Sequence, residues 1–123
     1  MTLKELINQI NSEKPSAFSS KYLCTFVNEA EQSIQEYLGT PLADRITYTW
    51  PDNEDAVLIA PPPYDRLYKS YLKAKIDFAQ EEYDSYANNV EQFNVDMAEY
   101  EGYAQRENLV INTSDNKYIT NWF

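Results

Sequence analysis

Hydrophobic residues recur with helical spacing over the first part of the chain and predict two amphipathic helices. The first covers residues 2–11, where Thr2 and Glu5 have the spacing of a capping box. Its apolar face consists of Leu3, Leu6, Ile7 and Ile10. The second helix covers residues 20–38, and Gly39 is suited to end it in the left-handed conformation.

A different pattern over residues 45–60 predicts a small β-hairpin. Ile46–Trp50 alternates β-branched and aromatic residues with a period of two, and Ala56–Ile59 is a short apolar run. The polar residues 51–55 between these runs have the composition of a turn. Three prolines at 61–63 then end any strand.

The longest helical pattern covers residues 63–106. From Leu72 onward the apolar residues follow one another at alternating steps of four and three, which is the heptad spacing of a coiled-coil seam. This seam consists of Leu72, Ile76, Ala79, Tyr83, Tyr86, Val90, Phe93, Met97, Tyr100 and Ala104. Because the phase continues through Asn88 and Asn89, the pattern predicts one helix that is continuous or merely kinked there.

These elements predict a mainly α fold, with two shorter helices packed on one long C-terminal helix and a small β-hairpin inserted at about 45–60. Residues 1–106 would form this helical domain. Residues 107–123 combine two apolar runs with a polar turn and are expected to form an extended C-terminal arm, with a second hairpin as the alternative.

The predicted long helix is longer than a compact domain of this size. A helix over residues 63–106 would be about 60 Å long, whereas the domain would be roughly 35 Å across. Its early half, with Tyr71 and Phe78, is expected in the core. We expect the later half to lie in an interface between subunits; the alternatives are that the helix breaks and folds back, or that the tail covers it. The partner-binding residues predicted on this basis are Tyr86, Val90, Phe93, Met97 and Tyr100.

The last residues of the chain add a second predicted contact. Ile119, Trp122 and Phe123 are large and apolar, yet they lie at a chain end, where order usually requires an anchor. We expect them to dock on a partner or an adjacent subunit, with Trp122 as the anchor. The alternative is that Trp122 covers the core of its own chain.

Charge is unevenly distributed along the chain. Acidic residues outnumber basic ones 20 to 10, so the net charge of −10 disfavours binding to free DNA or to anionic membranes. Residues 66–75 carry basic and no acidic side chains, and residues 76–105 carry acidic and no basic ones. This pattern fits copies that pack side by side with complementary charges, and it fits simple solvation equally well.

Residues that could carry chemistry are few. The chain has no histidine and one cysteine, Cys24, which excludes a histidine general base and a cysteine-rich zinc site. We therefore expect no enzymatic activity, no catalytic residues, no cofactor and no metal. The 11 tyrosines favour a protein that works through contact, because tyrosine is enriched at interfaces. No run of residues is apolar enough to span a bilayer.

Two stretches resemble a known family. Residues 26–39, which end in Ile34-Gln35-Glu36-Tyr37-Leu38-Gly39, resemble the second helix of head–tail connector proteins of tailed bacteriophages, also called adaptor or head-completion proteins. Residues 63–68, 82–89 and 93–94 are similar to neck-region proteins of phages and prophages of Gram-positive hosts.

The resemblance implies a mostly helical structural protein of the virion neck, assembled in the host cytoplasm. Many copies would form a homo-oligomeric ring that matches the portal's symmetry and receives the stopper or tail-completion protein. Genomic DNA would pass through the ring without specific binding, and no membrane would be involved. The alternative is a small phage- or prophage-encoded regulatory protein that acts as a coiled-coil homodimer.

Overall fold

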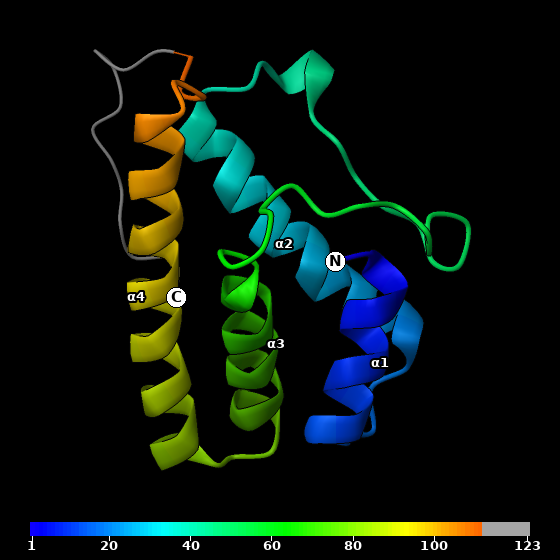
Figure 1. The fold of residues 1–123 in the computed structure, drawn as a ribbon. Coiled ribbons are helices and arrows are strands. Elements are labelled where there is room, and N and C mark those ends of the chain that lie inside the picture. Colours follow the sequence, from blue (N-terminus) through cyan, green and yellow to red (C-terminus); the bar gives the residue numbers. More distant parts are fainter. Residues whose placement is uncertain (112–123) are drawn as a thin grey trace.

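The computed structural model describes residues 1–111, which form four α-helices and one short 3-10 turn (Figure 1). These elements are α1 (Leu3–Glu13), α2 (Ser20–Leu38), η1 (Leu42–Asp44), α3 (Arg66–Ala79) and α4 (Tyr83–Arg106). Helix α3 packs against the other three helices: α4 runs antiparallel to it, α1 lies on its other side, and α2 crosses diagonally. The prediction of a mainly α fold is confirmed.

Local signals set the start of α1 and the end of α2, as the sequence predicts, whereas α1 ends at Glu13, two residues beyond the predicted end. The Thr2 hydroxyl accepts a hydrogen bond from the Glu5 backbone N–H (3.2 Å), and the Glu5 carboxylate accepts one from the Thr2 backbone N–H (2.8 Å). This capping box satisfies two backbone donors at the start of α1. Helix α2 ends at Gly39, whose φ of 79° is readily adopted by glycine.

Replacing Thr2 by alanine is expected to lower the free energy of unfolding by about 1 kcal/mol, because the backbone N–H of Glu5 loses its partner. Urea unfolding followed by circular dichroism measures this loss. Thr2→Ser is the matched control, since serine caps equally well. An alanine variant as stable as the serine variant would contradict the role of the cap.

The prediction of one long helix over residues 63–106 is wrong. The helix ends at Ala79, and the chain reverses through residues 80–82 before α4 begins. Glu81 occupies the left-handed region with a φ of 60°, which interrupts the helical path. The break therefore lies before Asn88 and Asn89, and the later half of the heptad seam lies on α4, which runs antiparallel to α3.

A buried carboxylate stabilises this reversal. Asp77 is fully buried at the end of α3 and accepts hydrogen bonds from the Ser85 hydroxyl and the Asn89 amide of α4, both at 2.7 Å. It also forms an ion pair with Lys14, which follows α1. Burial opposes ionisation of Asp77, but these bonds outweigh it and hold the pKa of the carboxyl below its ordinary value.

The predicted β-hairpin is also wrong, since residues 45–60 contain no strand. The second of the two expected strands pairs with the N-terminus instead. Thr2 and Val57 form an isolated antiparallel bridge, and the Leu58 backbone N–H donates to the Met1 carbonyl (3.0 Å). The two expected strands thus bind other parts of the chain and not each other.

The beginning of the expected arm belongs to the helical body. The Ile111 backbone N–H donates to the Leu38 carbonyl at the end of α2 (2.8 Å), and Val110 is half-buried against the core. The predicted docking residues Ile119, Trp122 and Phe123 lie outside the described residues.

Candidate interaction surface

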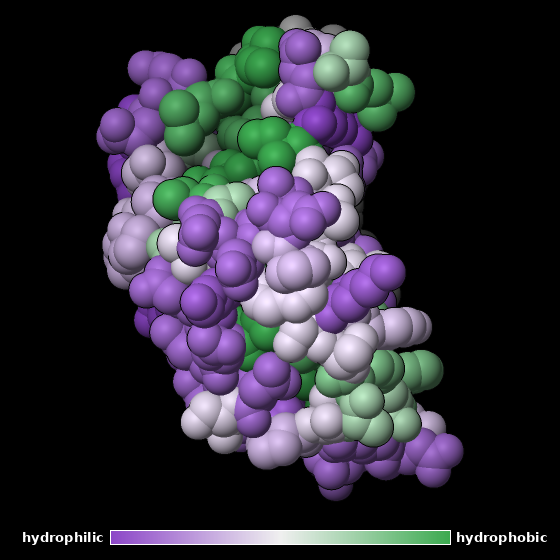
Figure 2. Space-filling view, turned by 90° about the vertical axis from the view of Figure 1, so that its right-hand side faces the viewer, coloured by the Kyte–Doolittle hydropathy of each residue, from purple (hydrophilic) through white to green (hydrophobic). Residues whose placement is uncertain are grey.

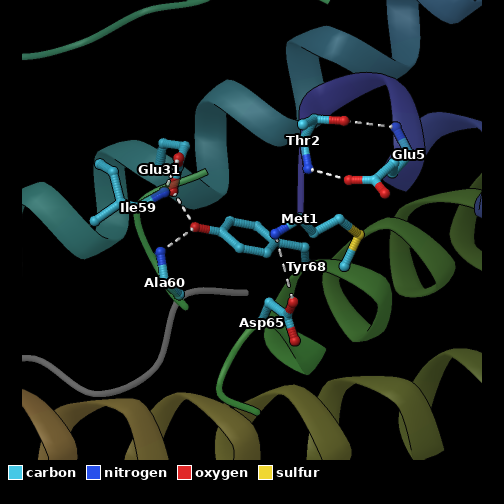
Figure 3. A network of polar contacts seen from close by, with 8 residues as sticks. All are labelled: Met1, Thr2, Glu5, Glu31, Ile59, Ala60, Asp65 and Tyr68. Atoms are coloured by element: carbon cyan, nitrogen blue, oxygen red, sulfur yellow. Dashed lines mark hydrogen bonds and ion pairs between the residues drawn. The ribbon is translucent and has the colours of Figure 1, made fainter. Parts of the chain in front are cut away.

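Residues 40–65, which join α2 to α3 and are called the connector below, are held by one buried carboxylate. Glu31, in the middle of α2, is fully buried. Its carboxylate accepts hydrogen bonds from the Tyr48 hydroxyl (2.6 Å), the Tyr68 hydroxyl (2.5 Å) and the Ile59 backbone N–H (3.0 Å) (part of this network is drawn in Figure 3). One side chain therefore ties two parts of the connector to α2 and α3.

The protonation of this network follows from its burial. Loss of solvent raises the pKa of Glu31, and the hydrogen bonds it accepts offset this only in part. Burial and the nearby carboxylate raise the pKa of Tyr48 and Tyr68, so both hydroxyls remain protonated and can donate. The Tyr68 hydroxyl also accepts from the Ala60 backbone N–H (2.9 Å). Because these groups are enclosed, we assign them a structural role.

Two side-chain amides of α2 pair with the backbone of the connector. The Asn28 amide accepts from the Tyr48 N–H (2.8 Å) and donates to the Tyr48 carbonyl (2.9 Å). The Gln35 amide makes the same two bonds with Ile46, at 2.7 and 3.1 Å. In an extended strand, the backbone N–H and C=O groups of alternate residues point to the same side, as those of Ile46 and Tyr48 point to α2. Helix side chains thus take the place of the strand that the hairpin prediction expected here.

The connector exposes three large apolar side chains, Leu42, Ile46 and Val57, which we call the connector face. Their exposed fractions are 81%, 48% and 72%. Figure 2 shows apolar residues gathered in the upper part of the molecule, at the height of the connector. An open hollow of about 490 Å³ adjoins this region and is lined by Thr25, Asn28, Glu29, Gln32, Leu42, Arg45 and Thr47.

The sequence patterns do not single out the connector face. Leu42 belongs to no helical stripe, and both Ile46 and Val57 were expected in the strands of a hairpin. Exposed apolar residues on a loop leave no periodic signal, since periodicity arises only where one side of a regular element is buried. The one available signal for an exposed apolar site was the short apolar run Ala56–Ile59, which lies outside any amphipathic helix.

Three of the predicted interface residues lie in the chain's own core. Phe93, Met97 and Tyr100 are buried, and the Phe93 ring makes an edge contact with Tyr71 of α3 at 5.2 Å between centroids. The other two predicted residues of α4, Tyr86 and Val90, are half-buried. Because α3 covers the seam, the length argument for a subunit interface fails, and the alternative that the helix folds back is correct.

The expected core position of Phe78 is wrong, whereas that of Tyr71 is confirmed. Phe78 is 57% exposed and Tyr71 is 4% exposed. Phe78 lies near the α3–α4 reversal, where its ring contacts Tyr83 and Tyr86 at centroid distances of 6.1 and 5.3 Å. The expected burial of Phe78 assumed that the helix continues past Ala79, and the reversal at 80–82 removes that continuation.

The basic segment 66–75 is neutralised within the chain. Its side chains pair with acidic residues of all three other helices, with N–O distances of 2.8–3.4 Å. The pairs are Arg66–Glu99, Lys69–Glu13, Lys73–Glu13 and Lys75–Glu29. Contacts between copies are therefore not needed to explain the separation of charge. Each exposed pair contributes little to stability.

The one cysteine of the chain has no activating neighbour among the described residues. Cys24 is buried, burial raises the pKa of its thiol, and its sulfur lies 3.7 Å from the Tyr48 carbonyl. Residues 1–111 contain no group of three or more histidine, cysteine or carboxylate side chains that could hold a metal ion. No helix in the same part of the chain is long and apolar enough to cross a membrane.

Comparison with known proteins gives no relative: no protein-family model, no curated protein and no solved structure matches the chain.

Proposed function

We propose that the protein is a structural subunit of a bacteriophage head–tail connector ring, which joins the portal to the stopper or tail and extends the DNA channel. The observation that carries this proposal is the connector face, because its apolar side chains are exposed on a segment that hydrogen bonds to α2 hold in place. Large apolar side chains exposed on a fixed segment are found on proteins that bind other proteins. The resemblance of residues 26–39, 63–68, 82–89 and 93–94 to connector and neck proteins suggests which assembly it serves.

The proposed assembly is a ring of many copies in the virion neck, formed in the host cytoplasm and bound to the portal protein and to a stopper or tail-completion protein. The net charge of −10 suits a channel wall, since a negative surface repels the passing DNA and prevents adhesion. Neither a membrane nor a cofactor has a part in this function.

The rival function, a coiled-coil homodimer, depended on a seam free to pair with a second copy. Phe93, Met97, Tyr100 and Ala104 of that seam are buried within the chain. No observation on the described residues now favours the dimer over the ring.

Aspartate at both Leu42 and Val57 is expected to abolish binding to the portal protein encoded in the same phage genome, because charge would enter an apolar contact. The isolated variant should keep its Tm, since both side chains are exposed. Co-expression with the portal, followed by size-exclusion chromatography and negative-stain imaging of rings, measures the effect.

The matched control is Val95→Asp, which places the same charge at an exposed apolar residue of α4 outside the connector face. This variant should still form rings on the portal. Rings of normal composition from the Leu42, Val57 double variant would refute the proposed contact, and failure of the wild-type protein to bind the portal would refute the proposed function itself.

A further inference from the structure

The α3–α4 reversal exposes two aromatic rings and two carboxylates, and we call these four side chains the tip: Phe78, Glu81, Tyr83 and Asp84. All four are exposed, Phe78 by 57% and Tyr83 by 56%. The two ring planes stand at 70° to each other, with 6.1 Å between the centroids. More than half of each aromatic side chain is therefore open to a partner.

The reversal that carries the tip is held in place. The buried Asp77 carboxylate joins α3 to α4, as described above. The Glu81 backbone N–H donates to the Phe78 carbonyl (3.2 Å), and the Glu82 backbone N–H donates to the Asp77 carbonyl (2.9 Å). A site that is already ordered loses less conformational entropy when a partner binds.

The carboxylates of the tip are not neutralised within the described chain. Glu81 and Asp84 form no ion pair and no side-chain hydrogen bond within residues 1–111. The neighbouring Glu82 is paired with Lys14 (3.4 Å), and the basic residues of 66–75 are paired with other acidic residues. The tip therefore carries uncompensated negative charge on the same reversal as its exposed rings, which makes it complementary to a cation.

Elsewhere in the chain, the same combination of groups binds a cation. The Lys75 ammonium lies 5.4 Å from the centroid of the Tyr71 ring and 3.4 Å from the Glu29 carboxylate. Ring faces attract cations electrostatically. Arginine suits such a site better than lysine, because its planar guanidinium stacks on a ring while its N–H groups donate to carboxylates. The groups of the tip therefore fit an arginine side chain.

We propose that the tip is a docking site for an arginine-containing segment of a partner protein. The guanidinium group stacks on the Phe78 or Tyr83 ring and donates hydrogen bonds to the Glu81 or Asp84 carboxylate. The tip is separate from the connector face, since η1 lies at the opposite end of the molecule (Figure 1). The inference does not rest on the proposed function, because it uses a different surface.

Aromatic NMR spectra of the labelled full-length protein, titrated with the peptide acetyl-Gly-Arg-Gly-Arg-Gly-amide, test the proposal. The Phe78 and Tyr83 ring signals should shift in a saturable way. The ring signals of Tyr22, which is 52% exposed on α2, should not shift. The same peptide with lysine in place of arginine should bind at least about twofold more weakly, because an ammonium group does not stack on a ring.

One pair of variants tests the rings. Tyr83→Leu keeps an apolar side chain but removes the ring, so it should weaken binding of the arginine peptide about two- to fivefold. Tyr22→Leu is the matched control, since it removes a similarly exposed ring outside the tip, and it should bind the peptide as the wild type does. Both variants should keep the wild-type Tm, because both side chains are exposed.

A second pair of variants tests the charges. Glu81→Gln combined with Asp84→Asn should also weaken peptide binding about two- to fivefold, because the charge-assisted hydrogen bonds are lost. Asp52→Asn combined with Asp55→Asn changes the net charge equally at exposed residues of the connector, and it should leave the peptide affinity unchanged.

Three results would overturn the proposal. Ring signals of the tip that stay in place as the arginine peptide is added would show that the tip binds no such segment. An equal loss of affinity in a test variant and its control would assign the binding to the net charge of the protein. Ring signals of the tip that shift with protein concentration, before any peptide is added, would assign the tip to a second copy. None of these results bears on portal binding, so the two proposals fail separately.

Discussion

Replacement of Phe93 by aspartate is expected to unfold the isolated chain. Phe93 is fully buried between α3 and α4, where its ring contacts Tyr71. Loss of a buried phenylalanine side chain costs about 3–5 kcal/mol, and an unpaired buried charge adds to this cost. Because a domain of this kind is stable by only about 5–15 kcal/mol, circular dichroism should show lost helicity and no cooperative thermal transition.

Phe78→Ala is the matched control for this prediction. Phe78 lies on α3 near the reversal and is mostly exposed, so we expect a loss below about 1 kcal/mol. A Phe93→Asp variant that keeps the wild-type Tm would show that α4 does not pack on α3, and would restore the single long helix with an exposed seam.

Replacement of Glu31 by alanine is expected to lower the free energy of unfolding by about 3–5 kcal/mol, because it leaves three buried donors without an acceptor and opens a cavity. These donors are the Tyr48 and Tyr68 hydroxyls and the Ile59 N–H. Urea unfolding at neutral pH measures the loss. Glu31→Gln should cost less, since the amide keeps an acceptor and can donate to the Tyr68 hydroxyl. Unchanged stability of the alanine variant would show that Glu31 does not anchor the connector.

The same pair of proteins tests the protonation of Glu31. Because burial raises its pKa above the ordinary value of 4.5, the folded state binds the proton more tightly than the unfolded state. The stability that this proton contributes is fully present below about pH 4.5 and is lost as the pH rises through the raised pKa. The stability of the wild type relative to Glu31→Gln should therefore fall with rising pH in this range. A relative stability that rises instead would contradict a raised pKa for the buried Glu31 carboxyl.

The start of α1 and the end of α2 could be predicted from the sequence because their signals are local. The capping box of Thr2 and Glu5 and the left-handed Gly39 act within one turn of the helix that they limit. The apolar stripes could be predicted for the same reason, since the burial of one side of a helix requires their spacing. The predicted heptad seam of α3 and α4 is likewise largely buried, although it is covered by a partner that the sequence did not indicate.

Tertiary structure decided where that seam bends and what the connector pairs with. The reversal at 80–82 contains neither glycine nor proline, and it depends on Asp77 binding Lys14 from a distant part of the chain. The connector is extended because Glu31, Asn28 and Gln35 of α2 supply its hydrogen-bond partners, which no residue near Ile46 or Tyr48 in the sequence reveals. The exposure of Ile46 and Val57 accompanies similar contacts, since Ile46 is held by Gln35 of α2 and Val57 pairs with Thr2 at the N-terminus. Periodicity reports which residues of a regular element are buried, whereas these features depend on pairs of residues that only the folded chain brings together.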